Sequence, residues 1–178
     1  MLRVLRRFVR WVRLRSYDQY GIANHFRAQG ASIGSGCRLL VRDLGSEPYL
    51  ITIGDECLVS SDVMFVTHDG GTWVGRDRDP RLSVFGRITI GRRCFVGARS
   101  IMLPGTTLGD RCIVGAGAVC KGSYPAGSVI AGVPGRVIGT TEDYLQRASA
   151  SSLDLPDAVF PLEAGDRATL RNHLVKRL

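Results

Sequence analysis

Residues 90–119 read IGRRCFVGARSIMLPGTTLGDRCIVGAGAV, and a period of six runs through them. An aliphatic residue opens each hexapeptide, and a small residue follows it four places later. The aliphatic set is Ile90, Val96, Met102, Leu108 and Val114, and the small set is Cys94, Ser100, Thr106, Cys112 and Ala118. A six-residue unit is too short for a helix hairpin or a propeller blade. The pattern therefore predicts an all-β fold in which short strands, joined by tight corners, wind into a β-solenoid.

A second period of 18 residues sets the size of one coil. Gly97-Ala98 recurs as Gly115-Ala116, and Ile90-Gly91 recurs as Leu108-Gly109. Three six-residue sides make such a coil, so residues 18 apart are expected to stack at about 4.8 Å. Aliphatic side chains then fill the centre of a triangular prism, and small residues fill its corners.

The extent of the repeat predicts the organisation of the chain. The sequence has 178 residues, 44% of them hydrophobic, which suits one domain with a real core. We expect the solenoid over residues 31–139, after a lead-in at 1–30 and before a C-terminal capping arm at 140–178 that holds a short helix from Asp166. Residues 70–87 are polar, rich in Gly and Arg and aperiodic, so they are predicted to be an extruded, functional loop.

The five cysteines show no CxxC pair and no Cys/His cluster with the spacing of metal ligands. Cys37, Cys57, Cys94 and Cys112 each lie four residues after an aliphatic residue, where Ser, Thr and Ala stand in other hexapeptides. We interpret them as small buried spacers. No metal site is expected, and free thiols suit a reducing compartment.

The first 15 residues hold six arginines, while the formal charge of the whole chain is +8. On a helix five of these arginines fill one side and apolar residues, including Trp11, fill the other, while Leu14 and Arg15 are exceptions. Such a helix can lie on an anionic membrane surface but is too interrupted by charge to span it. It can equally pack over the first coil or on a neighbouring subunit, and a mitochondrial presequence is a third alternative. Nucleic acid is not expected as a partner, because the rest of the chain lacks a basic face.

His68 is the candidate catalytic residue. Counted from Phe65, it falls at the outward-facing fourth position of its hexapeptide, immediately before the aperiodic loop. Histidine is suited to taking a proton from a hydroxyl near neutral pH. A surface histidine without function is the alternative interpretation. The other two histidines, His25 and His173, lie outside the repeats.

Several motifs share their order and spacing with one known family. They are Thr67-His68-Asp69-Gly70-Gly71-Thr72-Trp73, Phe95-Val96-Gly97-Ala98, Val114-Gly115-Ala116-Gly117-Ala118-Val119 and Ala131-Gly132-Val133-Pro134-Gly135-Arg136-Val137-Ile138. Over about residues 31–139 the sequence resembles the hexapeptide-repeat acyltransferases, in particular the galactoside, xenobiotic and polysaccharide O-acetyltransferases. The resemblance implies a left-handed parallel β-helix and a homotrimer with active sites at the subunit interfaces. It also implies acetyl-CoA as the acyl donor and a carbohydrate as the acceptor.

The resemblance assigns His68 as the general base that deprotonates the acceptor hydroxyl as it attacks the thioester, without an acyl-enzyme. Within the loop, Asp69 is a candidate to orient His68 or to bind a sugar hydroxyl, although ordinary loop polarity explains it equally well. Trp73 is a candidate to stack on a pyranose ring.

The cofactor positions also come from the resemblance. Ala98 and Ala116 match positions whose backbone groups bind the pantetheine arm. Lys121 and Arg136 match basic residues that face the nucleotide end, where cations stabilise the phosphates. Cys120 stands where relatives have Thr before the lysine, so the hydroxyl is absent.

The resulting hypothesis is an acetyl-CoA-dependent O-acetyltransferase of a sugar hydroxyl in surface polysaccharide or lipid-linked oligosaccharide biosynthesis. We expect it in the cytoplasm, with peripheral contact at the inner face of the membrane through residues 1–15. The alternatives are an N-acyltransferase of a nucleotide-linked amino sugar, a non-catalytic β-helix scaffold, and a zinc-dependent relative of carbonic anhydrase, which needs several converging histidines.

Overall fold

The structure, a computed structural model, describes residues 17–157 and 165–177. The helix predicted at residues 1–15 lies outside these ranges. Two compact units divide at Tyr144 and Leu145, and the first of them holds all the strands that the structure describes. None of the described helices is both long and apolar enough to cross a membrane.

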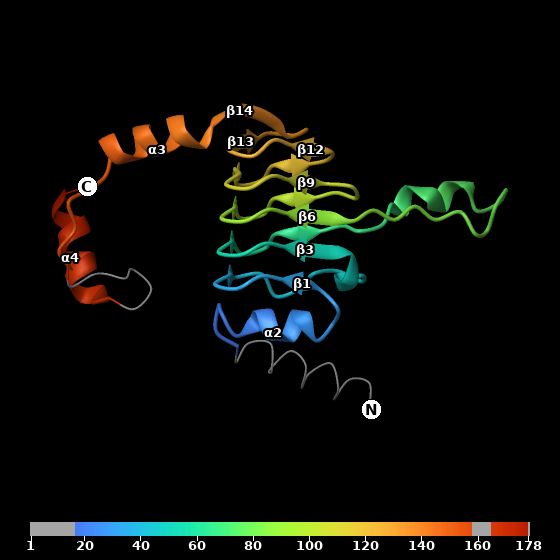
Figure 1. Cartoon of the computed structure of the whole chain (residues 1–178), viewed down its shortest axis with the longest axis horizontal. Helices are drawn as coiled ribbons and strands as arrows, with labels where there is room; N and C mark the ends of the chain where they lie inside the picture. Colours follow the sequence, from blue (N-terminus) through green and yellow to red (C-terminus); the bar gives the residue numbers. More distant parts are fainter. Residues whose placement is uncertain (1–16, 158–164, 178) are drawn as a thin grey trace. The chain divides into compact units, whose positions relative to one another are not determined.

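Short strands in the first unit form three sheets, called A, B and C here, which the chain visits in turn (Figure 1). Sheet A holds β1 (Ser32–Ile33), β3 (Ile51–Ile53), β6 (Ile88–Ile90), β9 (Thr107–Leu108) and β12 (Ser123–Tyr124). Sheet B holds β2 (Arg38–Leu39), β4 (Leu58–Val59), β7 (Phe95–Val96), β10 (Ile113–Val114), β13 (Ser128–Ala131) and β14 (Arg136–Thr140). Sheet C holds β5 (Met64–Phe65), β8 (Ile101–Met102) and β11 (Val119–Cys120).

Neighbouring strands pair in parallel, and within residues 90–120 they do so at the predicted spacing. Ile90 pairs with Leu108, and Val96 pairs with Val114, each 18 positions on. The one antiparallel pair among the named strands is β13 with β14, which ends the stack. The prediction of short strands in parallel sheets is confirmed, whereas the left hand of the winding stays a prediction.

The core follows the hexapeptide pattern. All five aliphatic residues of the opening stretch are at most 1% exposed, and all five small residues are at most 2% exposed. The two hydroxyls among these small residues have partners: Ser100 Oγ donates to the Gly97 carbonyl at 2.8 Å, and Thr106 Oγ1 donates to the Leu103 carbonyl at 2.7 Å. Apolar burial and satisfied polar groups therefore coincide at these positions.

The cysteine prediction is confirmed. All five are free thiols and buried. Four of them stack at the corner between sheets A and B, where each thiol donates to a backbone carbonyl of the next coil. Cys57 Sγ, for example, lies 3.0 Å from the Gly91 oxygen, and Cys94 Sγ lies 3.2 Å from the Gly109 oxygen.

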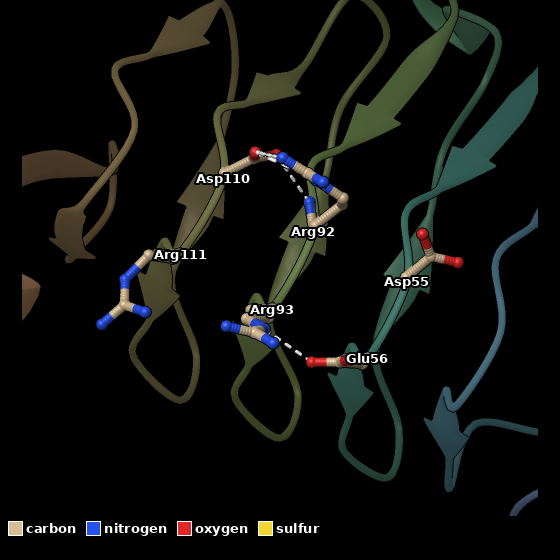
Figure 2. A pocket seen from close by; sticks show the side chains of 6 residues that line it. All are labelled: Asp55, Glu56, Arg92, Arg93, Asp110 and Arg111. Carbon is tan, nitrogen blue, oxygen red and sulfur yellow. Dashed lines mark hydrogen bonds and ion pairs between the residues drawn. The ribbon is translucent and has the colours of Figure 1, made fainter.

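Charged side chains cover the outside of that corner on three successive coils (Figure 2). Arg92 Nη2 lies 3.0 Å from Asp110 Oδ2, and Arg93 Nε lies 2.5 Å from Glu56 Oε2. The backbone N–H and guanidinium of Arg92 hold the pKa of Asp110 below its usual range. These pairs are exposed to solvent, so each contributes little to stability, but their alternation favours the observed register of coils.

A helix covers the open end of the first coil. α2 (Ile22–Arg27) lies under β1 and buries Ile22, Ala23 and Phe26 against the first coil (Figure 1). The repeat pattern did not predict this helix, because it has no hexapeptide period. At the other end, α3 (Thr141–Ala150) follows β14.

The second unit contains α4 (Arg167–Arg177), which confirms the helix expected from Asp166. Asp166 Oδ1 accepts from the backbone N–H groups of Ala168 at 2.9 Å and Thr169 at 3.2 Å, as an N-cap residue does. The capping role of the arm stays a prediction.

Candidate active site

His68 lies at the base of the extruded loop, directly after β5. Its backbone forms an isolated antiparallel bridge with Phe85, and the Gly86 N–H donates to the Thr67 carbonyl at 2.8 Å. These bonds close the base of an arm that extends from the stack beside β6, as predicted for residues 70–87 (Figure 1). The His68 side chain is 47% exposed and therefore faces outward, as the hexapeptide count predicted.

Glu47 is the partner of His68 that sequence reasoning missed. His68 Nδ1 lies 3.0 Å from Glu47 Oε2, and the hydroxyl of buried Thr67 donates to the same oxygen at 2.5 Å. Leu39 pairs with Val59, so this coil has 20 residues, and Glu47 stacks one coil below Thr67. Counting 20 back from Thr67 would have found it.

The carboxylate fixes the role of each imidazole nitrogen. The hydrogen bonds from Thr67 and His68 lower the pKa of Glu47, which keeps the carboxyl ionised. An ionised carboxylate only accepts hydrogen bonds, so His68 donates from Nδ1, and the neutral imidazole presents an unprotonated Nε2. The pair can therefore take a proton at Nε2.

The imidazole lines two cavities. One, of about 330 Å³, lies toward the outer face of sheet C, and its walls include Val66, Leu103, Pro104 and Lys121. The other, of about 240 Å³, lies within the arm, and its walls include Asp69, Thr72, Trp73, Arg76 and Phe85. Two reactants that enter from these two sides would meet at His68.

The predicted pantetheine positions follow sheet B and precede sheet C. Ala98 comes after β7 and Ala116 after β10, and the Gly117 N–H donates to the Ala98 carbonyl at 2.9 Å. They stack one coil apart, as a linear ligand would need. His68 comes after a strand of sheet C, so the pantetheine positions and His68 lie at opposite ends of the strands of that sheet.

Two of the remaining cofactor positions differ in accessibility. Lys121 is exposed and lines the sheet C cavity together with His68. Cys120 is 0% exposed, because its side chain points into the core opposite that of Lys121. The Cys120 side chain is therefore not accessible to a cofactor, and a contact through its backbone stays a prediction.

Arg136 begins β14 and is exposed. The turn before it, Gly132 to Gly135, stacks on β11, since the Val119 N–H donates to the Gly132 carbonyl at 3.0 Å. This turn brings Arg136 to the end of the stack beyond sheet C, and its contact with a nucleotide stays a prediction.

Asp69 and Trp73 both lie in the arm cavity. Asp69 Oδ1 accepts from the Gly71 N–H at 2.8 Å and so caps the short helix η2 (Gly70–Gly75). Orientation of His68, one of the two roles predicted for Asp69, is provided by Glu47 instead. Trp73 is 72% exposed, and the Arg76 guanidinium lies 5.1 Å from its ring centroid.

Within residues 17–157 and 165–177, no group of three or more His, Cys, Asp or Glu side chains is placed to hold a metal ion. The three histidines also lie on separate elements: His25 on α2, His68 after β5 and His173 on α4.

Comparison with known proteins supports the same architecture. A family model described as the hexapeptide repeat of succinyl-transferase matches residues 87–120. Protein CapG of Staphylococcus aureus is 46% identical over 121 residues, which are 66% of this chain and 70% of CapG. WbbJ of Escherichia coli K12, whose name provisionally gives it as a lipopolysaccharide biosynthesis O-acetyl transferase, is 35% identical over 96 residues, about half of each chain.

A solved structure shares the fold. The hexapeptide-repeat-containing acetyltransferase VCA0836 of Vibrio cholerae superposes with a TM-score of 0.56 at 18% identity, over 78% of this chain and 90% of its own. Its complex with acetyl coenzyme A gives a TM-score of 0.51 at 23% identity, over 62% and 60%. With the repeat model and the extensive identity to CapG, the chain belongs to the hexapeptide-repeat acyltransferase family.

Proposed function

We propose that the chain transfers an acetyl group from acetyl-CoA to a sugar hydroxyl, with His68 as general base. The observation that carries this proposal is the hydrogen bond between His68 Nδ1 and Glu47, which leaves Nε2 free where two cavities meet. Direct attack is favoured because all five thiols are buried, so none of them is accessible to act as a nucleophile toward the thioester.

In the proposed reaction His68 alone carries the proton from the acceptor to the leaving group. Nε2 takes the proton of the acceptor hydroxyl while the hydroxyl oxygen bonds to the thioester carbonyl carbon. The tetrahedral intermediate then collapses with cleavage of the carbon–sulfur bond, and the leaving CoA sulfur receives the proton from the imidazolium. Glu47 stabilises the positive charge on the imidazolium between the two steps.

We further propose that the donor binds along the outer face of sheet C between two copies of the chain. This face presents Met64, which is 55% exposed, with Ile101 and Val119 beside it. The VCA0836 complex supports acetyl-CoA as the donor, since its fold is similar. A left-handed winding and a homotrimer, as the family resemblance implies, would cover this apolar face with a second subunit.

The acceptor is proposed to be a surface polysaccharide or a lipid-linked oligosaccharide. The name of WbbJ supports this class, and the arginines of residues 1–15 suit peripheral contact with the cytoplasmic face of a membrane.

The test is acetyl transfer by the purified full chain to a glycan panel that includes a nucleotide-linked amino sugar. His68→Ala should lower kcat by about 10²- to 10⁴-fold, the usual contribution of a general base. His173→Ala, in the second unit, is the matched control and should leave kcat unchanged. Near-parental activity of His68→Ala would refute the assigned base, and acetylation of the amino sugar alone would favour N-acylation.

A further inference from the structure

We infer that Arg76 selects an acidic sugar, and that the anionic group of the acceptor, a carboxylate or a phosphate, binds to its guanidinium. This inference rests on the proposed function and specifies its acceptor. It places the anion in the arm cavity, on the other side of His68 from Lys121.

The arm holds the Arg76 guanidinium in a defined position. The Arg76 N–H donates to the Trp73 carbonyl at 3.3 Å at the end of η2, so the two residues share one short helical turn. The guanidinium then lies 5.1 Å from the Trp73 ring centroid, within the range of a cation–π contact. The ring orders the cation and removes water from one of its faces.

The cation has no carboxylate partner among the residues that the structure describes. Some arginines of the solenoid are paired with a carboxylate, as Arg92 is with Asp110 and Arg93 with Glu56. In the arm, Asp79 accepts from the backbone N–H of Arg81 at 2.9 Å, and Asp69 accepts from that of Gly71. Arg76 is therefore an ordered cation whose edge N–H groups remain available to a ligand, and such groups match the oxygens of carboxylate or phosphate.

The cavity also explains why the ligand should be a sugar and not a simple anion. Asp69 lines the same cavity, and a carboxylate accepts hydrogen bonds from sugar hydroxyls. Asp69 repels any anion bound at Arg76, but a sugar that carries the anion offsets this repulsion because its hydroxyls donate to Asp69. One face of the Trp73 ring is covered by the guanidinium, so a pyranose can stack only on the other.

The first experiment compares acetyl transfer to matched acceptors by the full chain. Methyl glucuronide and methyl galacturonide carry a carboxylate, glucose 1-phosphate carries a phosphate, and methyl glucoside and methyl galactoside are neutral. We expect kcat/KM for an acidic acceptor to exceed that of its neutral match by about 10- to 100-fold, the range of a charge-assisted hydrogen bond. The better of the two anions identifies the group.

Arg76→Gln should remove this preference, so that kcat/KM for an acidic acceptor falls to that of its neutral match. Arg76→Lys should retain only part of it, because an ammonium lacks the planar fork. Arg78→Gln, on the same arm but not in the wall of the cavity, is the matched control. Equal use of acidic and neutral sugars by the parent, or an undiminished preference in Arg76→Gln, would overturn the inference and leave the proposed acetyl transfer standing.

A binding measurement separates the two hypotheses if no sugar is acetylated. The chain has two tryptophans, so Trp11→Phe leaves Trp73 as the only indole. We expect methyl glucuronide or glucose 1-phosphate to change its fluorescence, and Arg76→Gln to abolish that change. Fluorescence that responds equally to methyl glucoside, or to none of these ligands, would reject an anion site at Arg76.

Discussion

Replacement of Glu47 by glutamine should impair catalysis while it leaves the fold intact. The amide keeps the shape of the carboxylate and can still accept from Thr67. The same oxygen can also accept from His68 Nδ1, since both hydrogen bonds go to one atom of Glu47, but the neutral amide does not stabilise the positive charge that His68 gains in the reaction. His68 is therefore a weaker base toward the acceptor hydroxyl.

The magnitude follows from the geometry. The 3.0 Å bond between His68 and Glu47 becomes charge-assisted when His68 is protonated in the reaction, and such bonds contribute about 1.5–3 kcal/mol. Glu47 is 14% exposed but His68 is 47% exposed, so solvent screens part of the interaction. With about 1.4 kcal/mol for each tenfold change, we expect kcat/KM to fall by roughly 10- to 50-fold.

The assay is release of free CoA thiol at saturating and at limiting acetyl-CoA, with a thermal melt of each variant. Thr67→Val is the matched control, because it removes the other hydrogen bond to Glu47 and spares the bond to His68. It should cost about 1 kcal/mol of stability and change kcat less than threefold. Combining Glu47→Gln with His68→Ala should be no worse than His68→Ala alone. An unchanged kcat/KM in Glu47→Gln would refute the assigned positioning role.

Leu108→Ala should lower the free energy of unfolding by about 2–5 kcal/mol, because this 1% exposed side chain fills the centre of a coil; a urea midpoint equal to the parent's would contradict that. Gly97→Ala should cost about 1–3 kcal/mol, since its Cβ would lie 2.6 Å from a backbone nitrogen of the next coil, whereas Gly139→Ala, with no heavy atom within 4 Å, should be neutral. The lowered pKa of Glu47 means that its contribution to stability is full above its unfolded value, near 4.3, and is lost as pH falls through the folded value. Urea midpoints below about pH 4.5 should therefore decline less steeply in Glu47→Gln than in the parent, and equal slopes would argue against the linkage. Replacing residues 72–83 with two glycines should leave the melting temperature nearly unchanged, because none of them is buried, but should abolish sugar acetylation; a cooperative melt with retained activity would exclude the arm from the site.

The sequence predicts most of the scaffold because one local rule repeats. Val96 and Met102 are buried for the same reason, since each opens a hexapeptide, and their stacking partners lie 18 residues on. The outward position of His68 follows from the same count. Counting was sufficient wherever the coil length stayed constant.

The missed features lie where the period changes or is absent. Glu47 falls in an interruption of the pattern, so its place beside His68 depends on a coil of 20 residues and not 18. α2 has no hexapeptide signal and forms because Ile22 and Phe26, one turn apart, cover the open end of the first coil. Cys120 was assigned by its place in a motif, but alternation along β11 turns its side chain inward.

Coil length varies at one corner only, and this explains why the site lies there. From sheet A to B the buried residues stay six apart, as from Ile53 to Val59, and from B to C the same spacing runs from Val59 to Phe65. The glycines of these two corners, such as Gly54 and Gly97, touch the backbone of the next coil, so an insertion there would separate the stack. Between sheet C and the next strand of sheet A, the chain is free to leave. Both the interruption that supplies Glu47 and the arm that follows His68 use this freedom, and the rigid coils above and below hold the two side chains within hydrogen-bond distance.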